Sequence, residues 1–245
     1  MHVADKALAL NDITGGNPED WLVTGWFTPD YRPLAEAFAA QLAQHGAPYH
    51  LWGKPQMDGM SRLEKILMKP AVVLEAMAAY PDKTVALMDV DCLVRGNLSP
   101  LVDIPGDVGV ALFGGMPPKD TDWRVWLGLS TRVMVLRPTE PARAFAEKWA
   151  ALVNEHGGHE ERCAAMAFLS STADVRFHHI DIAYSGRDTY QLPDGVVVHE
   201  SASSTQKATE RHPVMQALRN LERRFFRSGR SSRQKAAMTH IMRSI

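Results

Sequence analysis

Two aspartates, Asp89 and Asp91, follow an apolar run at residues 84–88 that has the composition of a buried strand in a parallel sheet. Alternate side chains of an extended chain lie on one face, so both carboxylates point the same way and Val90 points back into the protein. Like charges at this spacing repel each other unless a cation or a proton lies between them. A divalent metal ion with oxygen ligands and a phosphate-bearing substrate would satisfy both carboxylates. Two solvated aspartates at a strand end are the alternative interpretation.

The setting of this D-x-D motif resembles the metal site of GT-A glycosyltransferases. A buried strand, the motif, a short apolar segment and the N-x-x-P-L turn at residues 97–101 follow one another as in that family. There the two aspartates bind a manganese or magnesium ion that clamps the diphosphate of a nucleotide-sugar. The resemblance therefore implies that Asp89 and Asp91 hold Mn2+ or Mg2+, and that Asp89 also contacts the nucleotide-sugar.

The resemblance also implies a third metal ligand after the last predicted strand, residues 195–198. His199 follows this strand where the family has a metal-binding histidine, and Lys207 lies where a family lysine reaches the diphosphate. Two aspartates and one imidazole favour manganese or magnesium over calcium, which prefers oxygen ligands alone. A polar residue that merely ends an apolar strand is the alternative interpretation of His199.

Alternating strand and helix patterns place these residues on an α/β scaffold. Residues 21–27 predict a strand, residues 28–30 a turn that opens a helix ending at His45-Gly46, and residues 48–52 a second strand. A strand–helix–strand opening implies a right-handed crossover and a parallel sheet. Further strands are predicted at 84–88, 108–113, 132–137, 176–180 and 195–198, and helices at 61–68, 70–80, 140–155 and 160–171. Residues 1–20 are expected to form an irregular lead-in.

The alternation of strands and helices predicts a mostly parallel sheet with helices on both faces, and the resemblance implies that residues 1–209 form a single GT-A (Rossmann-like) domain. Residues 210–245 are expected to form a basic, amphipathic helical tail. Residues 207–245 contain 10 Lys or Arg against 2 Asp or Glu, whereas residues 1–206 contain 17 against 26. Such a tail suits an anionic membrane surface, the acidic body of the protein or a partner.

Nucleotide-binding residues are expected around the end of the first strand. In the resembling glycosyltransferases this strand ends in a Thr or Ala, followed shortly by a Tyr that stacks on the nucleotide base. Thr24, Thr28 and Tyr31 match this order and are candidates for contacts with the nucleotide-sugar. A helix-capping Thr28 and a partly buried Tyr31 are the structural alternative.

A basic residue near the nucleotide-sugar is expected just before the D-x-D strand. Arg62, Lys65 and Lys69 recur at helical spacing on one face. Lys69-Pro70 matches the family segment K-x-x-x-K-P, which packs on the sheet with a basic residue near the donor. Lys69 and Arg62 are therefore candidates for donor contacts, and solvated charges on an exposed helix face are the alternative.

The candidate catalytic carboxylates, Glu160 and Glu161, open the predicted helix at residues 160–171. Acidic residues in a first helical turn are also favoured by the helix dipole alone. The family has an acidic pair at this place that faces the sugar. In its retaining members a carboxylate here stabilises the oxocarbenium-like transition state or acts as nucleophile. The resemblance implies this role for Glu161, with Glu160 hydrogen-bonding sugar hydroxyls.

The segment before this helix resembles the family in part. It matches at Arg137-Pro138-Thr139 and Trp149, and it departs at Leu129 and Thr131, where Asn and Gly are usual. The Gly- and Pro-rich loop at residues 114–126 carries tryptophans that suit either stacking on a sugar acceptor or anchoring of the loop.

Composition limits the class of protein. With 45% hydrophobic and 22% charged residues the chain is an ordinary soluble globular protein, and no stretch approaches the ~20 apolar residues that cross a membrane. No secretory pattern opens the sequence. Two cysteines, Cys92 and Cys163, are too few for a disulfide framework and fit a reducing cytoplasm. We expect a cytoplasmic protein, with the tail as a peripheral contact at the inner face of the membrane, and no nucleic-acid partner.

These motifs favour a hexosyltransferase-like enzyme that moves a sugar from a nucleoside-diphosphate sugar to an acceptor hydroxyl. By resemblance the donor is UDP-linked, the acceptor is a glycan, a lipid-linked molecule or a protein, and the setting is cell-surface glycan assembly. A haloacid-dehalogenase-like phosphatase using Asp89 and Asp91 is the alternative enzyme, although about eighty residues precede the motif and no acidic pair ends a later buried strand. A non-catalytic module that binds nucleotide-sugar is the third interpretation.

Overall fold

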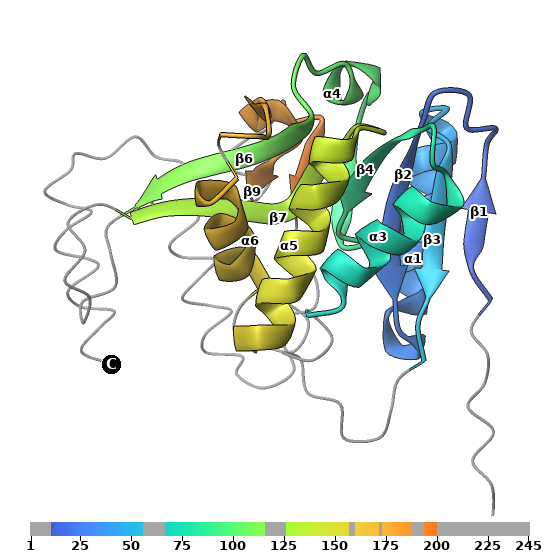
Figure 1. Cartoon of the computed structure of the whole chain (residues 1–245). Helices are drawn as coiled ribbons and strands as arrows, with labels where there is room; N and C mark the ends of the chain where they lie inside the picture. Colours follow the sequence, from blue (N-terminus) through green and yellow to red (C-terminus); the bar gives the residue numbers. More distant parts are fainter. Residues whose placement is uncertain are drawn as a thin grey trace, which may run out of the picture. The chain divides into compact units, whose positions relative to one another are not determined.

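The computed structural model of the chain (Figure 1) describes residues 11–55, 67–115, 126–156, 160–171, 173–187 and 194–199. The chain divides into two units, Met1–Glu200 and Ser201–Ile245. The second unit lies outside the described residues, so the predicted boundary at residue 209 and the predicted helical tail stay predictions. None of the helices in the described part of the chain combines the length and apolar character that crossing a membrane requires.

A seven-stranded sheet forms the centre of the first unit, in the order β1-β3-β2-β4-β7-β6-β8. Its strands are β1 (Ile13–Gly15), β2 (Trp21–Phe27), β3 (Tyr49–Gly53), β4 (Thr84–Met88), β6 (Val108–Gly115), β7 (Trp126–Leu136) and β8 (Phe177–His179). β2 pairs in parallel with β3 and β4, and β6 with β8, whereas β1 and β7 are antiparallel to their neighbours. All strands except β1 and β7 therefore point one way, which confirms the predicted mostly parallel α/β sheet.

Helices cover both faces of this sheet. They are α1 (Arg32–Gln44), α3 (Lys69–Ala79), α4 (Ser99–Val102), α5 (Glu140–His156) and α6 (Glu160–Leu169), with 3-10 turns η1 (Pro29–Tyr31) and η2 (Ile182–Tyr184). Along β4, Val85 and Leu87 belong to the core cluster under α3, α5 and α6, which lie together on one side of the sheet in Figure 1. Ala86 and Met88 belong to the cluster packed against α1 and α4, as the two-residue period of a strand requires. β4 is therefore buried on both faces up to the residue before the D-x-D motif.

A second sheet has three short strands in the order β5-β10-β9, and its strand β5 directly follows the D-x-D motif. The strands are β5 (Cys92–Val94), β9 (Gly186–Arg187) and β10 (Val197–His199). β10 is antiparallel to β5, with His199 opposite Cys92. The predicted last strand therefore exists but pairs outside the main sheet, and His199 is its final residue.

The structure differs from the sequence prediction in parts, and some of the prediction lies outside the described residues. Residues 1–20 are not wholly irregular, because β1 forms there and its backbone pairs with β3. The strand predicted at 132–137 begins at Trp126, and its register against β6 shifts between Val110 and Ala111, where residues 131–133 of β7 have no paired residue in β6. The predicted helix at 61–68 lies mostly outside the described residues. Of the predicted loop at 114–126, the first and last residues belong to strands and residues 116–125 lie outside the described residues.

Candidate active site

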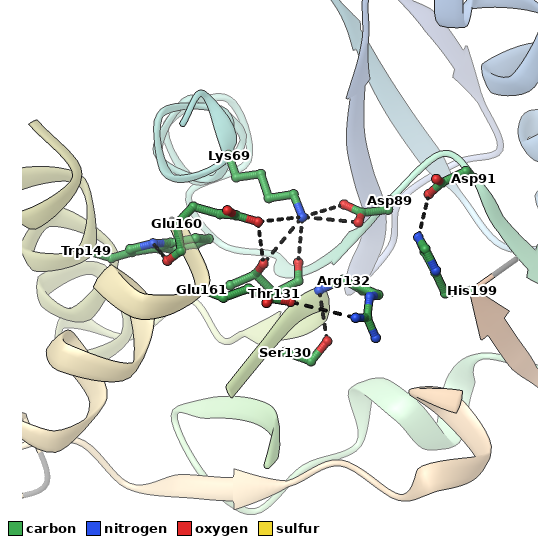
Figure 2. A network of polar contacts seen from close by, with 10 residues as sticks. All are labelled: Lys69, Asp89, Asp91, Ser130, Thr131, Arg132, Trp149, Glu160, Glu161 and His199. Carbon is green, nitrogen blue, oxygen red and sulfur yellow. Dashed lines mark hydrogen bonds and ion pairs between the residues drawn. The ribbon is translucent and has the colours of Figure 1, made fainter. Parts of the chain in front are cut away.

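The three predicted metal ligands meet at the carboxyl end of β4. The Asp89 backbone N–H donates a hydrogen bond to the Arg132 carbonyl at 3.0 Å, and the Asp89 carbonyl accepts one from the Cys92 N–H at 3.0 Å. This turn carries Asp91 towards β10, where His199 Nε2 lies 3.2 Å from Asp91 Oδ1. One ligand atom from each of Asp89, Asp91 and His199 lies within 4.8 Å of the others, and Figure 2 shows the aspartates on either side of the turn.

The charges of this cluster fit a divalent cation. Burial raises the pKa of Asp89, Lys69 lowers it and Asp91 raises it, and the net shift is upward. His199 Nδ1 is buried and has no hydrogen-bond partner among the described residues. A cation would relieve the repulsion between the carboxylates, and two carboxylates with one imidazole form a donor set that manganese and magnesium accept. The residues present therefore fit the predicted metal.

Lys69 is the centre of a buried polar network beside the metal cluster (Figure 2). Its side chain is 8% exposed and its Nζ lies 2.8 Å and 3.1 Å from the two carboxylate oxygens of Asp89. The same ammonium donates to Thr131 Oγ1 at 3.3 Å and lies 3.5 Å from Glu160 Oε1. Burial lowers the pKa of Lys69, but Asp89 and Glu160 outweigh that effect and the net shift is upward, so the ammonium stays charged. The predicted contact of Lys69 with a nucleotide-sugar would require it to leave one of these partners.

The two predicted catalytic carboxylates have different surroundings. Glu160, the first residue of α6, is buried and accepts a hydrogen bond from Thr131 Oγ1 at 3.2 Å. Its backbone carbonyl accepts a hydrogen bond from Trp149 Nε1 at 3.0 Å. The Glu161 side chain is 35% exposed, and its Oε1 lies 3.9 Å from Arg132 Nη2. Glu161 is therefore the carboxylate that a substrate can reach, whereas Glu160 belongs to the buried network.

Arg132 is a residue of the site that the sequence did not single out. It lies in β7, where its carbonyl binds the Asp89 N–H, and its side chain points towards Glu161. In the sequence it is only the first residue of a predicted strand. Arg132 could be identified as a cation opposite the D-x-D motif, but only when the register of β4 against β7 is known.

The two threonines predicted to contact a nucleotide are enclosed at β2. Thr24 is fully buried in the sheet, where its hydroxyl donates to the His50 carbonyl at 3.2 Å and accepts from Trp52 Nε1 at 3.0 Å. Thr28 is buried ahead of η1 and donates to the Asp30 carboxylate. Both hydroxyls are engaged within the protein, so contact with a nucleotide would cost one of these hydrogen bonds.

The other residues predicted to contact the nucleotide-sugar are Tyr31, Arg62 and Lys207, and the structure describes only the first of them. Tyr31 is partly buried and packs against the core cluster under α1. Arg62 and Lys207 lie outside the described residues and stay predictions. The part of the site that the structure describes is therefore the metal cluster, the buried network and the Glu161–Arg132 pair.

The described fold is similar to solved glycosyltransferases. One involved in the glycosylation of the major capsid of PBCV-1 is 13% identical, covers 78% of this chain and 99% of its own, and has a TM-score of 0.55. The galactosyltransferase LgtC in complex with donor and acceptor sugar analogues is 10% identical, with 73% of this chain and 86% of that chain covered and a TM-score of 0.47. No protein-family model and no curated protein matches the sequence. The first likeness shows that the chain has the predicted GT-A fold.

Proposed function

We propose that this protein is a metal-dependent glycosyltransferase, which moves a sugar from a UDP-linked donor to a hydroxyl of an acceptor. The observation that carries the proposal is the convergence of Asp89, Asp91 and His199 within 4.8 Å, at the carboxyl end of β4 on a GT-A fold. Ligands of open α/β sheets bind at this edge. The acceptor that we propose is a glycan, a lipid-linked molecule or a protein in cell-surface glycan assembly.

In this proposal Asp89, Asp91 and His199 hold Mn2+ or Mg2+. When bound, the ion stabilises negative charge on the departing nucleoside diphosphate. Lys207 adds a second cation to the diphosphate, as the resembling family implies for its position. Tyr31 is proposed to stack on the base, as the resemblance implies.

The carboxylates at the start of α6 are proposed to face the sugar. Glu161 is the accessible one, and we assign to it the stabilisation of the oxocarbenium-like transition state or the nucleophilic attack. Glu160 is fixed by Lys69 and Thr131. Its predicted hydrogen bond to a sugar hydroxyl would replace or share one of these contacts.

Calorimetric titration of UDP and GDP, with and without manganese, tests the proposal on wild type and Asp91→Ala. Asp82→Ala is the matched control, because the Asp82 side chain is 74% exposed and pairs with Lys83 at the surface. Manganese-dependent binding that is lost in Asp91→Ala and kept in Asp82→Ala supports the proposal. Wild type that binds neither nucleotide would refute it.

Two further outcomes identify the alternative functions. Metal-dependent hydrolysis of an aryl phosphate without nucleotide binding would indicate a phosphatase that uses Asp89 and Asp91. Manganese-dependent nucleotide binding without turnover of any nucleotide-sugar would indicate a binding module. The pKa values of Asp89 and Lys69, which lie side by side, are both raised, and perturbed groups of this kind favour the enzyme.

The basic tail is proposed to contact an anionic membrane at the cytoplasmic face. Its support is compositional, with 10 Lys or Arg against 2 Asp or Glu in residues 207–245. Sedimentation of the full chain with phosphatidylglycerol or phosphatidylcholine vesicles tests this at low and high salt. Binding to the anionic vesicles alone, weakened by salt, is the expected result, and equal binding to both or to neither contradicts it.

A further inference from the structure

The two cations of the candidate site are held very differently. Lys69 is 8% exposed, and carboxylate or hydroxyl oxygens lie 2.8 to 3.5 Å from its ammonium. Arg132 is 17% exposed, and among the described residues the contact of its guanidinium is a single ion pair with Glu161 at 3.9 Å. A guanidinium carries five N–H donors in a planar fork, so most of its binding capacity is unused by the described residues.

Arg132 also lies beside the metal cluster. Its backbone carbonyl accepts the hydrogen bond from the Asp89 N–H at 3.0 Å. Figure 2 shows the Arg132 side chain leaving β7 between Glu161 and His199.

A partly buried cation with one long ion pair is costly unless a ligand completes its hydrogen bonds. The planar fork of arginine matches the oxygens of a phosphate group in pairs. We propose that Arg132 binds the diphosphate oxygens of the nucleotide-sugar, and that Glu161 holds the guanidinium in position until the donor arrives. This inference rests on the proposed glycosyltransferase function, and it assigns the diphosphate a further protein cation in addition to the metal and Lys207.

Titration of inorganic pyrophosphate in magnesium, and of UDP and GDP in manganese, tests this assignment without knowledge of the sugar. Arg132→Gln is expected to weaken binding of pyrophosphate and of the nucleotide that wild type binds about tenfold to hundredfold, because it removes charge-assisted hydrogen bonds. Arg132→Lys keeps the charge but not the fork and should fall in between. The matched control is Arg162→Gln, because Arg162 is exposed on α6 beside Glu161 and should bind diphosphate like wild type.

Glu161→Gln separates a binding role of Arg132 from a purely structural one, because a structural arginine would not change how this variant binds pyrophosphate. Releasing the guanidinium from Glu161 should tighten pyrophosphate binding several-fold in the wild-type background and leave it unchanged in the Arg132→Gln background. If Arg132→Gln does not fold, the single Glu161→Gln variant decides, and unchanged or weaker binding overturns the inference.

The outcomes separate this inference from the function on which it depends. Wild type that binds no diphosphate in metal refutes both. Metal-dependent diphosphate binding that is equally tight in Arg132→Gln refutes the role of Arg132 and leaves the glycosyltransferase proposal standing.

Discussion

Two aspartates at opposite ends of the sheet, the partly buried Asp89 and the buried Asp107, have different surroundings. Asp107 precedes β6 and accepts hydrogen bonds from the Arg176 backbone N–H at 3.0 Å, the Arg176 guanidinium at 3.3 and 3.4 Å, and the Thr139 hydroxyl at 3.1 Å. Burial opposes ionisation of Asp107, but these hydrogen bonds outweigh it and lower its pKa. For Asp89 burial and the neighbouring Asp91 outweigh Lys69, and its pKa is raised.

The difference separates a structural carboxylate from one that requires a ligand. Asp107 joins the start of β6, the start of β8 and the turn before α5 with bonds that the chain itself supplies. At the Asp89 end Lys69 and His199 lie within ion-pair distance of Asp89 and Asp91, and His199 Nδ1 is buried without a hydrogen-bond partner among the described residues. A buried polar atom without a partner costs stability and is typical of functional sites.

Removal of Lys69 should produce the largest loss of stability. Lys69→Ala leaves Asp89 and Glu160 without the ammonium that they share, and losing one partner of a buried ion pair costs about 3 kcal/mol. Urea unfolding at pH 7 measures the effect. Lys83→Ala is the control, because Lys83 pairs with the exposed Asp82 and should cost at most about 0.5 kcal/mol. Equal losses in both variants would show that the network does not depend on its cation.

Asp91→Asn should separate activity from stability. We expect a loss of about a hundredfold or more in manganese affinity and sugar transfer, since even the supporting residues of metal sites cost about tenfold to hundredfold. The melting temperature in metal-free buffer should stay the same or rise, because the repulsion with Asp89 is removed. A variant that melts several degrees lower and keeps its activity would assign Asp91 a structural role.

Asp107→Asn should do the reverse, with about 2 kcal/mol of stability lost and transfer activity kept. Because the folded pKa of Asp107 is lowered, its contribution is present above the unfolded pKa of about 3.9 and is lost as the pH falls through the folded value. The difference between wild type and variant in urea unfolding should therefore be full at pH 7 and shrink below about pH 3.9. Thr139→Val, which removes one neutral hydrogen bond, should cost about 1 kcal/mol. A difference that does not change with pH would contradict the ionised state of Asp107.

The sequence predicted those parts of the site that local patterns encode. The place of Asp89 and Asp91 after a buried strand was predictable because the apolar run directly before them is local in sequence, and the mostly parallel sheet was predictable because strand and helix periods alternate. His199 was placed by order along the chain. Its approach to Asp91 depends on the pairing of β10 with β5. Each of these strands has three residues, which is too short for the sequence to predict the pairing.

The partners of Lys69 and the position of Arg132 could not be predicted in this way. Thr131 is 62 residues from Lys69 in sequence, and Glu160 belongs to a different helix. From sequence alone, a lysine at helical spacing is interpreted as a solvated charge. Lys69 is buried because the apolar residues of α3 pack this helix against the sheet. Long-range register, rather than residue type, decides which charges are buried.

Gly25→Ala should give the smallest effect and tests how the Asp89 end is positioned. A Cβ at Gly25 would lie 2.6 Å from the backbone oxygen of Met88, which is too close for both atoms to stay in place. The end of β4 must therefore move at Met88, the residue before Asp89. We expect about 1 kcal/mol of lost stability and several-fold weaker manganese binding. Gly96→Ala is the control, because its Cβ would meet a Val196 methyl at 3.3 Å rather than backbone. If both variants bind manganese equally well in calorimetry, the close approach of β2 to β4 does not position the metal ligand.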